Sequence, residues 1–191
     1  MALKTKVYIS NVTNLTEARY YAGMEVSIIG FNATPDATSF TTSTQFDAIT
    51  SWLSGAKIAW QWHLPISQTF IDLCSESKHD FIEITLIPEI QTLNKINKPI
   101  LLRTKDLQEV SRITPDIEKY LEAIVWEGDL ETLPSLKNIP IYIQSPSSLN
   151  AEEFALTNPE IGIALDGIPE SRPGWNNFDQ MADLLESLEI S

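Results

Sequence analysis

The chain has 191 residues, of which 43% are hydrophobic and 20% charged, and its formal net charge at pH 7 is −13. This composition excludes a disordered chain and a coiled coil, and the length is sufficient for one domain with a full hydrophobic core. No change in composition marks a linker, so residues 1–191 are expected to form a single domain. Such an acidic chain disfavours nucleic acids and anionic membranes as partners, and more weakly a phosphorylated ligand.

Neither the N-terminus nor the single cysteine points to an extracellular or membrane protein. The opening residues MALKTK precede no apolar run, and no stretch of the chain is long enough to span a membrane. One cysteine, Cys74, provides no disulfide framework, which is typical of a reducing compartment. We therefore expect a cytoplasmic protein, either a monomer or a homodimer.

Short apolar segments alternate with helical segments along the whole chain. The expected strands are 7–9, 26–31, 57–62, 81–85, 99–103, 123–126, 141–144 and 161–165. The expected helices are 15–22, 44–53, 67–77, 89–95, 107–120, 130–136, 151–156 and 178–188. Eight such units can close into a barrel, whereas an open sheet of this length usually has fewer strands and longer helices. The expected fold is α/β, a small (β/α)8 TIM barrel, short enough for one helix to be reduced to a turn.

The first strand-helix-strand unit, residues 7–31, places the first candidate site residue. Asn14 or Thr13 can cap the start of its helix, and Gly23 can end the helix in a left-handed conformation. The two strands are therefore expected to be parallel. Ser10 leaves the first of them, and in parallel α/β proteins the carboxyl ends of the strands carry the chemistry.

This opening resembles that of a known enzyme family. Residues 9–18, ISNVTNLTEA, resemble the segment KICGITNLEDA of phosphoribosylanthranilate isomerase, and residues 30–31 stand where that family has GF. Near the other end, residues 147–153 resemble the family's GGLNPEN and residues 166–177 its SSGVESSPGVKD. The resemblance is weak from 45 to 141. It implies a TIM barrel and, for the family, an Amadori rearrangement of an aminoaldose phosphate in tryptophan biosynthesis.

The resemblance also identifies site positions, most of them substituted. Ser10 stands where the family has its catalytic cysteine, and Asn11 where it has glycine. Glu127 follows the sixth strand, where the family has an aspartate that acts as general acid. Ser39 stands where an arginine holds the substrate's carboxylate. A serine hydroxyl stays protonated near neutral pH unless a base lies beside it, and no histidine is expected near Ser10.

The last two loops correspond to the family's phosphate-binding and substrate-binding loops. Glycines there let the backbone approach a phosphate, and serine gives up part of that freedom. The resemblance gives phosphate-binding positions at Ser147, Ser148 and Gly167, with Arg172 as a source of charge and Asp166 as a substrate-binding position.

Two functional hypotheses remain open. Base, carboxylate anchor and phosphate glycines are substituted together, which suggests a catalytically silent relative that binds a small phosphorylated or other anionic ligand, or a protein partner, linked to tryptophan metabolism. The alternative is an active isomerase of N-(5-phosphoribosyl)anthranilate, or a related sugar-phosphate enzyme, whose remodelled site uses Glu127, Asp129, Asp166 and Arg103. No cofactor is expected under either hypothesis.

Two other groups of residues are expected to be structural. Cys74 lies near His63 and His79, but the spacing suits neither a metal site nor a nucleophile, so a packed helix cysteine is expected and no metal. In the third strand, Trp60 and Trp62 are expected to point one ring into the barrel and the other towards its helices.

Overall fold

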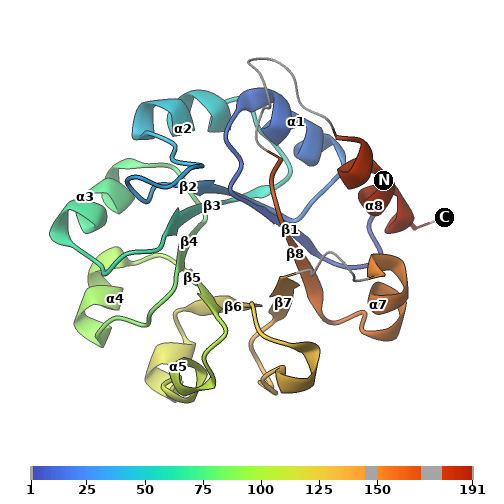
Figure 1. Cartoon of the computed structure of the whole chain (residues 1–191). Coiled ribbons are helices and arrows are strands. Elements are labelled where there is room, and N and C mark those ends of the chain that lie inside the picture. Colours follow the sequence, from blue (N-terminus) through green and yellow to red (C-terminus); the bar gives the residue numbers. More distant parts are fainter. Residues whose placement is uncertain (1, 145–149, 169–177, 191) are drawn as a thin grey trace.

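The structure, a computed structural model, describes residues 2–144, 150–168 and 178–190. Eight parallel strands follow one another around a closed barrel, and the first pairs with the last (Figure 1). The TIM barrel expected from the sequence is confirmed. The strands are β1 (Val7–Ser10), β2 (Ile28–Asn32), β3 (Lys57–Trp62), β4 (Phe81–Ile84), β5 (Ile100–Thr104), β6 (Leu121–Trp126), β7 (Ile141–Gln144) and β8 (Gly162–Asp166).

Helices cover the outside of the barrel (Figure 1). They are α1 (Leu15–Gly23), α2 (Ser43–Thr50), α3 (Gln68–Glu76), α4 (Ile90–Ile96), α5 (Leu107–Ser111), α6 (Pro115–Glu118), α7 (Ala151–Thr157) and α8 (Asp179–Ser187). After β6 there is only a short 3-10 turn, η1 (Leu130–Thr132), ahead of Pro134. The helix expected over 107–120 is broken in two, because Pro115 cannot continue a helix and instead begins α6. The expectation that one helix would be reduced to a turn is confirmed by η1, which stands where a helix over 130–136 was expected.

The ends of α1 are only partly as expected. Asn14 caps its start by accepting a hydrogen bond from the Glu17 N–H at 2.9 Å. Gly23 is the last helical residue rather than a left-handed one, and the left-handed residue is Glu25, with φ of 56°. The expectation for Gly23 was therefore wrong, because the left-handed residue that follows the helix is Glu25, two positions later.

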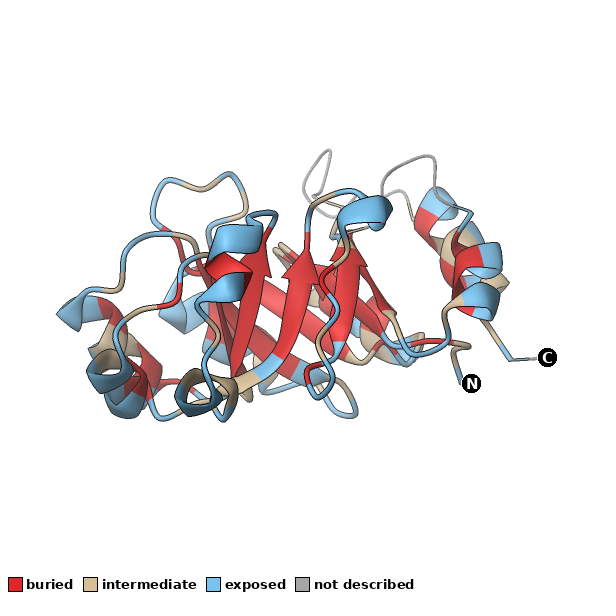
Figure 2. Cartoon of the chain, turned by 90° about the horizontal axis from the view of Figure 1, so that it is seen from below, coloured by how far each residue is buried: buried red, intermediate tan, exposed pale blue. Residues whose placement is uncertain are grey.

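Two apolar layers stabilise the barrel, and Figure 2 shows the strands buried along most of their length. The inner layer fills the barrel with side chains from every strand: Tyr8, Ile28, Ala59, Phe81, Leu101, Ala123, Val125, Tyr142 and Ala164. The outer layer lies between strands and helices. Trp60 stacks on Phe46 of α2 with ring centroids 4.1 Å apart, and Trp62 on Phe70 of α3 at 4.5 Å.

Both tryptophans therefore point outwards, and the expectation that one would point into the barrel was wrong. Residues two apart in a strand share a face, so the inward residue is Gln61 between them. Cys74 is buried in α3 as expected, and burial raises the pKa of its thiol to about 12, which leaves it unreactive near neutral pH. In the described part of the chain, no cluster of three or more potential metal ligands occurs and no helix has the length and apolarity needed to cross a membrane.

Candidate functional site

All eight strands point to the same end of the barrel, which we call the mouth (Figure 2). At the mouth the inward-facing side chains change from apolar to polar. Gln61 of β3 is in register with Glu83 of β4, and Ser10 of β1 with Asp166 of β8. Parallel pairing thus brings residues that are far apart in the sequence side by side at one level of the barrel.

Six residues form a closed circuit of hydrogen bonds across the mouth, which we call the mouth ring: Asn11, Gln61, Glu83, Arg103, Gln144 and Asp166. On one side, the Asn11 backbone N–H donates to Gln61 Oε1 at 2.8 Å, and Gln61 Nε2 donates to Glu83 Oε1 at 2.7 Å. Arg103 Nε then donates to the same Glu83 oxygen at 2.9 Å.

The circuit closes through β7 and β8. Arg103 Nη1 donates to Gln144 Oε1 at 2.8 Å, and Gln144 Nε2 donates to Asp166 Oδ2 at 3.2 Å. Asn11 Nδ2 donates to Asp166 Oδ1 at 2.8 Å. Each member is oriented by both neighbours, so the mouth ring is a fixed polar layer on top of the apolar barrel core.

Glu83 is the buried charge at the base of this layer. Its side chain is fully buried, and its Oε1 also lies 2.8 Å from His63 Nε2. Burial alone would raise the pKa of this carboxyl, but the Arg103 guanidinium and the hydrogen bonds from His63 and Arg103 outweigh burial and hold the pKa well below its usual range. Glu83 is therefore ionised, and His63 donates to it through Nε2.

Ser10, at the family's catalytic-base position, is completely buried. Its Oγ lies 2.6 Å from Asp166 Oδ1 and 3.1 Å from the Leu165 carbonyl oxygen. The hydroxyl has one proton, and the shorter contact directs it to the carboxylate. No histidine was expected beside Ser10, and the group that accepts its proton is the carboxylate of Asp166.

Ser39, at the family's arginine position, supports the mouth ring through Asn11. Its Oγ donates to Asn11 Oδ1 at 2.9 Å, and Asn32 Nδ2 donates to the same oxygen at 3.0 Å. Asn11 has a φ of 58°, a left-handed conformation that asparagine tolerates better than most residues. The side chain of Asn11 thus contacts Asn32, Ser39 and Asp166 at the mouth.

The open part of the mouth is a cavity of about 320 Å³ lined by polar and charged residues: Asn11, His63, Thr85, Arg103, Glu127, Gln144 and Asp166. Glu127 lies at its edge with its side chain 39% exposed, and Arg103 Nη1 donates to it at 3.1 Å. Arg103 itself is only 6% exposed and already paired with Glu83. Two exposed carboxylates, those of Glu127 and Asp166, thus face a cavity whose one arginine is neutralised.

The last two loops are only partly described. Ser147, Ser148 and Arg172 lie outside the described residues. The Gly167 N–H donates to the Ser10 carbonyl oxygen at 2.7 Å, and a Cβ at Gly167 would come within 2.3 Å of Glu17 Oε1. Close approach to Glu17 and to the backbone of β1 is therefore sufficient reason for a glycine at this position.

The structure thus brings Ser10, Ser39, Glu127 and Asp166 to one end of the barrel and joins them through Asn11 and Arg103. Asp129, which follows Glu127, does not line the cavity; its carbonyl accepts from Trp126 Nε1 at 3.2 Å. Sequence reasoning missed four mouth residues: Gln61, His63, Glu83 and Gln144. Three of them carried a signal, since Gln61, Glu83 and Gln144 each place a polar side chain at or near the end of an otherwise apolar strand.

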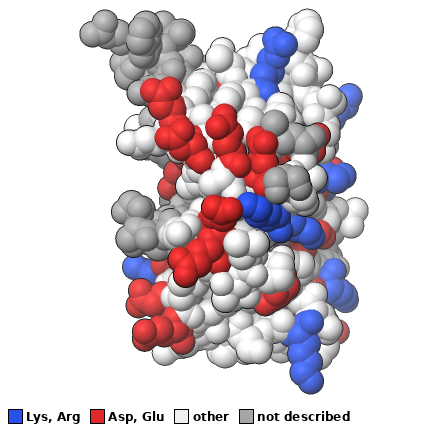
Figure 3. Space-filling model, turned by 90° about the vertical axis from the view of Figure 1, so that its right-hand side faces the viewer, with Lys and Arg blue, Asp and Glu red and all other residues white. Residues whose placement is uncertain are grey.

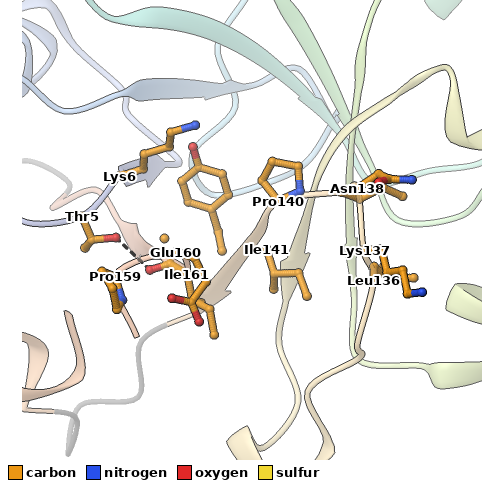
Figure 4. Close-up of a pocket in the computed structure, with 13 residues that line it drawn as sticks. Thr5, Lys6, Leu136, Lys137, Asn138, Pro140, Ile141, Pro159, Glu160 and Ile161 are labelled. Atoms are coloured by element: carbon orange, nitrogen blue, oxygen red, sulfur yellow. Dashed lines mark hydrogen bonds between the residues drawn. The ribbon is translucent and has the colours of Figure 1, made fainter. Parts of the chain in front are cut away.

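A second cavity, of about 450 Å³, lies at the opposite end of the barrel (Figure 4). It is bounded by the segment that leads into β7, including Asn138 and Pro140, and by the starts of β1 and β8, including Lys6 and Ile161. Although it is larger than the mouth cavity, it lies where the strands begin. Chemistry in TIM barrels sits where the strands end, so we place the candidate site at the mouth.

Comparisons with known proteins find similar proteins by structure alone, since no protein-family model and no curated protein matches this sequence. Phosphoribosyl anthranilate isomerase from Thermus thermophilus superposes with a TM-score of 0.69 at 14% identity, over 96% of this chain and 98% of that one. TrpF from Jonesia denitrificans gives 0.73 at 10% identity over 96% of each chain. KGPDC from Streptococcus mutans gives 0.56 at 13% identity, over 86% of this chain and 87% of that one. Over nearly its whole length, this chain has the barrel fold of the phosphoribosylanthranilate isomerases.

Proposed function

We propose that this chain is a phosphoribosylanthranilate isomerase-like barrel that does not isomerise N-(5-phosphoribosyl)anthranilate and whose mouth binds a different ligand. The observation that carries the proposal is the state of Ser10. Its hydroxyl is buried, and its Oγ donates its proton to Asp166 Oδ1 at an oxygen-to-oxygen distance of 2.6 Å rather than into the cavity.

The family's reaction needs a base that removes the proton at C2 of the sugar. A serine hydroxyl is uncharged near neutral pH, and both burial and the adjacent carboxylate oppose its ionisation. Ser10 is therefore a hydrogen-bond donor that orients Asp166. Its uncharged oxygen is too weak a base to take up the proton that general-base catalysis would remove.

The substrate's carboxylate would also lack its anchor. An arginine can grip a carboxylate with two charge-assisted hydrogen bonds, whereas Ser39 has one proton, which it donates to Asn11. The carboxylates of Glu127 and Asp166, which line the mouth cavity, would in addition repel the carboxylate of the substrate.

A fluorescence assay of the purified protein, with phosphoribosylanthranilate generated in place, tests this proposal. We expect no turnover above the rate without protein and no growth of an isomerase-deficient, tryptophan-requiring strain that carries the gene. An intact isomerase assayed in parallel shows that the substrate is competent. Turnover that follows the protein through purification would overturn the proposal.

One observation favours a second candidate, an enzyme that acts on another sugar phosphate. Asp166 and Glu127 line the same cavity, and Asp166 is oriented by three donors, from Ser10, Asn11 and Gln144. Such a pair can serve as base and acid. Screening ketose and aldose phosphates for isomerisation, with Asp166→Asn as the matched variant, distinguishes the two. Activity present in the wild type and lost in a folded Asp166→Asn protein would favour the enzyme.

A further inference from the structure

We infer that the mouth end of the barrel is a docking surface for a partner polypeptide that presents a lysine or arginine within an apolar segment. The inference names the ligand class of the proposed function and rests on it to that extent. Two independent features of the surface support it: an arc of exposed apolar side chains and the negative charge that this arc partly encloses.

The first feature is the apolar rim. In the described part of the chain, nine large apolar side chains are exposed, and six of them lie on the loops or helix starts that follow β2 to β6. These five strands are consecutive in the barrel, so the segments that follow them adjoin around the mouth. The apolar rim consists of Phe40, Leu64, Leu86, Ile90, Leu107 and Leu130, which are 38–56% exposed.

The six side chains of the apolar rim differ from ordinary exposed apolar residues because they all lie at one end of the barrel. Scattered exposed apolar residues need no explanation, but exposed apolar residues gathered at one end of the molecule are typical of an interaction surface. The other three exposed side chains, Trp52, Leu156 and Ile190, follow or end α2 and α7 or lie at the C-terminus, away from the mouth.

The second feature is the charge that this arc partly encloses. The mouth cavity offers the carboxylates of Glu127 and Asp166, whereas Arg103 is buried and paired with Glu83. A basic side chain is suited to this arrangement, because its aliphatic stem can lie on the apolar rim while its charged head reaches the carboxylates. The complementary partner therefore carries positive charge at the centre of an apolar segment.

Charge also argues against a second copy of this chain as the occupant. Each copy has a formal charge of −13, and pairing two mouths would bring Glu127 and Asp166 towards the same carboxylates of the other copy. Acidic side chains are also spread over the face that carries α7 and α8 (Figure 3). Like charges facing one another across an interface disfavour association, so the partner is a basic polypeptide.

Selection of random linear peptides displayed on phage, using the immobilised full chain, tests the inference. We expect the selected peptides to be enriched in lysine or arginine flanked by apolar residues. A synthetic consensus peptide with a fluorescent label is then titrated against the protein. Its affinity should fall as salt is raised, because the contact includes exposed charges.

Two variants examine the two features separately. Glu127→Gln/Asp166→Asn removes the charge at nearly constant shape and should weaken the consensus peptide by about tenfold. Leu64→Ser/Leu86→Ser removes part of the apolar rim without touching the mouth ring and should weaken it by a similar factor of about ten. Trp52→Ser/Leu156→Ser, which changes the same kind of exposed side chain far from the mouth, is the matched control and should bind as the wild type does. Circular dichroism and thermal melts of each variant verify the fold.

Three outcomes would overturn the inference. The first is that the selected peptides lack basic residues. The second is that the consensus peptide binds Glu127→Gln/Asp166→Asn and Leu64→Ser/Leu86→Ser as tightly as the wild type. The third is that the wild type sediments as a dimer and Leu64→Ser/Leu86→Ser as a monomer. The last result would assign the apolar rim to a second copy. The isomerase assay is read separately, so turnover would overturn the proposed function, whereas failed peptide selection without turnover would overturn only this inference.

Discussion

At the scale of single residues, the mouth is organised by a few buried polar groups rather than by the positions that the family resemblance identified. Glu83 accepts hydrogen bonds from β3 and β5 on one oxygen, and Asn11 contacts β2, β3 and β8 from the end of β1. Ser10 and Ser39 each donate to one of their neighbours. The two positions that the resemblance assigns to the base and the carboxylate anchor thus support a polar network.

Glu83→Gln tests how much this network depends on its buried charge. The change leaves the buried Arg103 with only the partly exposed Glu127 as counter-charge, so we expect the free energy of unfolding to fall by about 3 kcal/mol. Because the pKa of Glu83 in the folded protein lies below its ordinary value of 4.5, its contribution is present above pH 4.5 and is lost as the pH falls below that value. Urea titrations at a series of pH values should show a weaker acid dependence for Glu83→Gln than for the wild type.

Glu131→Gln, at an exposed carboxylate of η1, is the control for Glu83→Gln and should leave both stability and its acid dependence nearly unchanged. Equal effects of the two substitutions would show that the buried ion pair contributes nothing particular.

Ser10→Cys restores the family's residue at the base position, and we expect it to give no isomerase activity. The new thiol would lie beside the Asp166 carboxylate, which favours its protonated form, and Ser39 would still leave the substrate's carboxylate without an anchor. The fluorescence assay is compared with Ser10→Ala, which defines the rate without any group at this position. Turnover by Ser10→Cys clearly above that of Ser10→Ala would show that one missing base is the whole defect.

At the scale of elements, the strands could be predicted well and the site only in part. The strands were predictable because each is a short apolar run between polar segments, and their order then requires a parallel barrel. The helix over 107–120 was overextended because its apolar positions continue past Ile113, while Pro115 starts a new helix. The mouth ring was not predictable, because its hydrogen bonds join residues from five strands and the residue after β1, and their pairing depends on the register of the closed barrel.

Gly167→Ala examines the join between β8 and the start of α1. The added Cβ would meet Glu17 Oε1 at 2.3 Å and the Ser10 carbonyl oxygen at 3.1 Å, and Glu17 is completely buried. We expect the free energy of unfolding to fall by about 1–3 kcal/mol. Gly23→Ala is the matched control, because nothing lies within 4 Å of its Cβ position and alanine favours a helix. Denaturant titrations in which Gly167→Ala is no less stable than Gly23→Ala would contradict a packing role for this glycine.

At the scale of the whole molecule, charge is distributed unevenly between the two ends of the barrel. Lysines line the cavities where the strands begin, namely Lys6, Lys57, Lys98, Lys119 and Lys137. In Figure 3, most of the visible basic side chains lie along one edge, while acidic side chains are scattered over the rest of the face. The mouth carries Glu127 and Asp166. The end that would carry chemistry in a TIM barrel therefore attracts cations, and the end that would not is richer in lysine.

This distribution makes a phosphate titration informative. The family resemblance predicts that an anion binds the loops after β7 and β8, around Ser147, Ser148 and Gly167, with Arg172 supplying charge. Because the Gly167 N–H already donates to the Ser10 carbonyl oxygen, we expect amide NMR shifts at Ser147 and Ser148 and little change at Gly167. Potassium chloride at equal ionic strength is the control for general screening.

The mouth cavity gives the opposite expectation for the same titration. An anion there would have to approach Glu127 and Asp166, so the side-chain signals of Arg103 and Gln144 should not move. Shifts at Arg103 or Gln144 would show that phosphate enters the mouth, and would also count against a cationic partner as its occupant. Shifts confined to residues around Lys6 and Lys137 would instead place the anion at the far end of the barrel, where the strands begin.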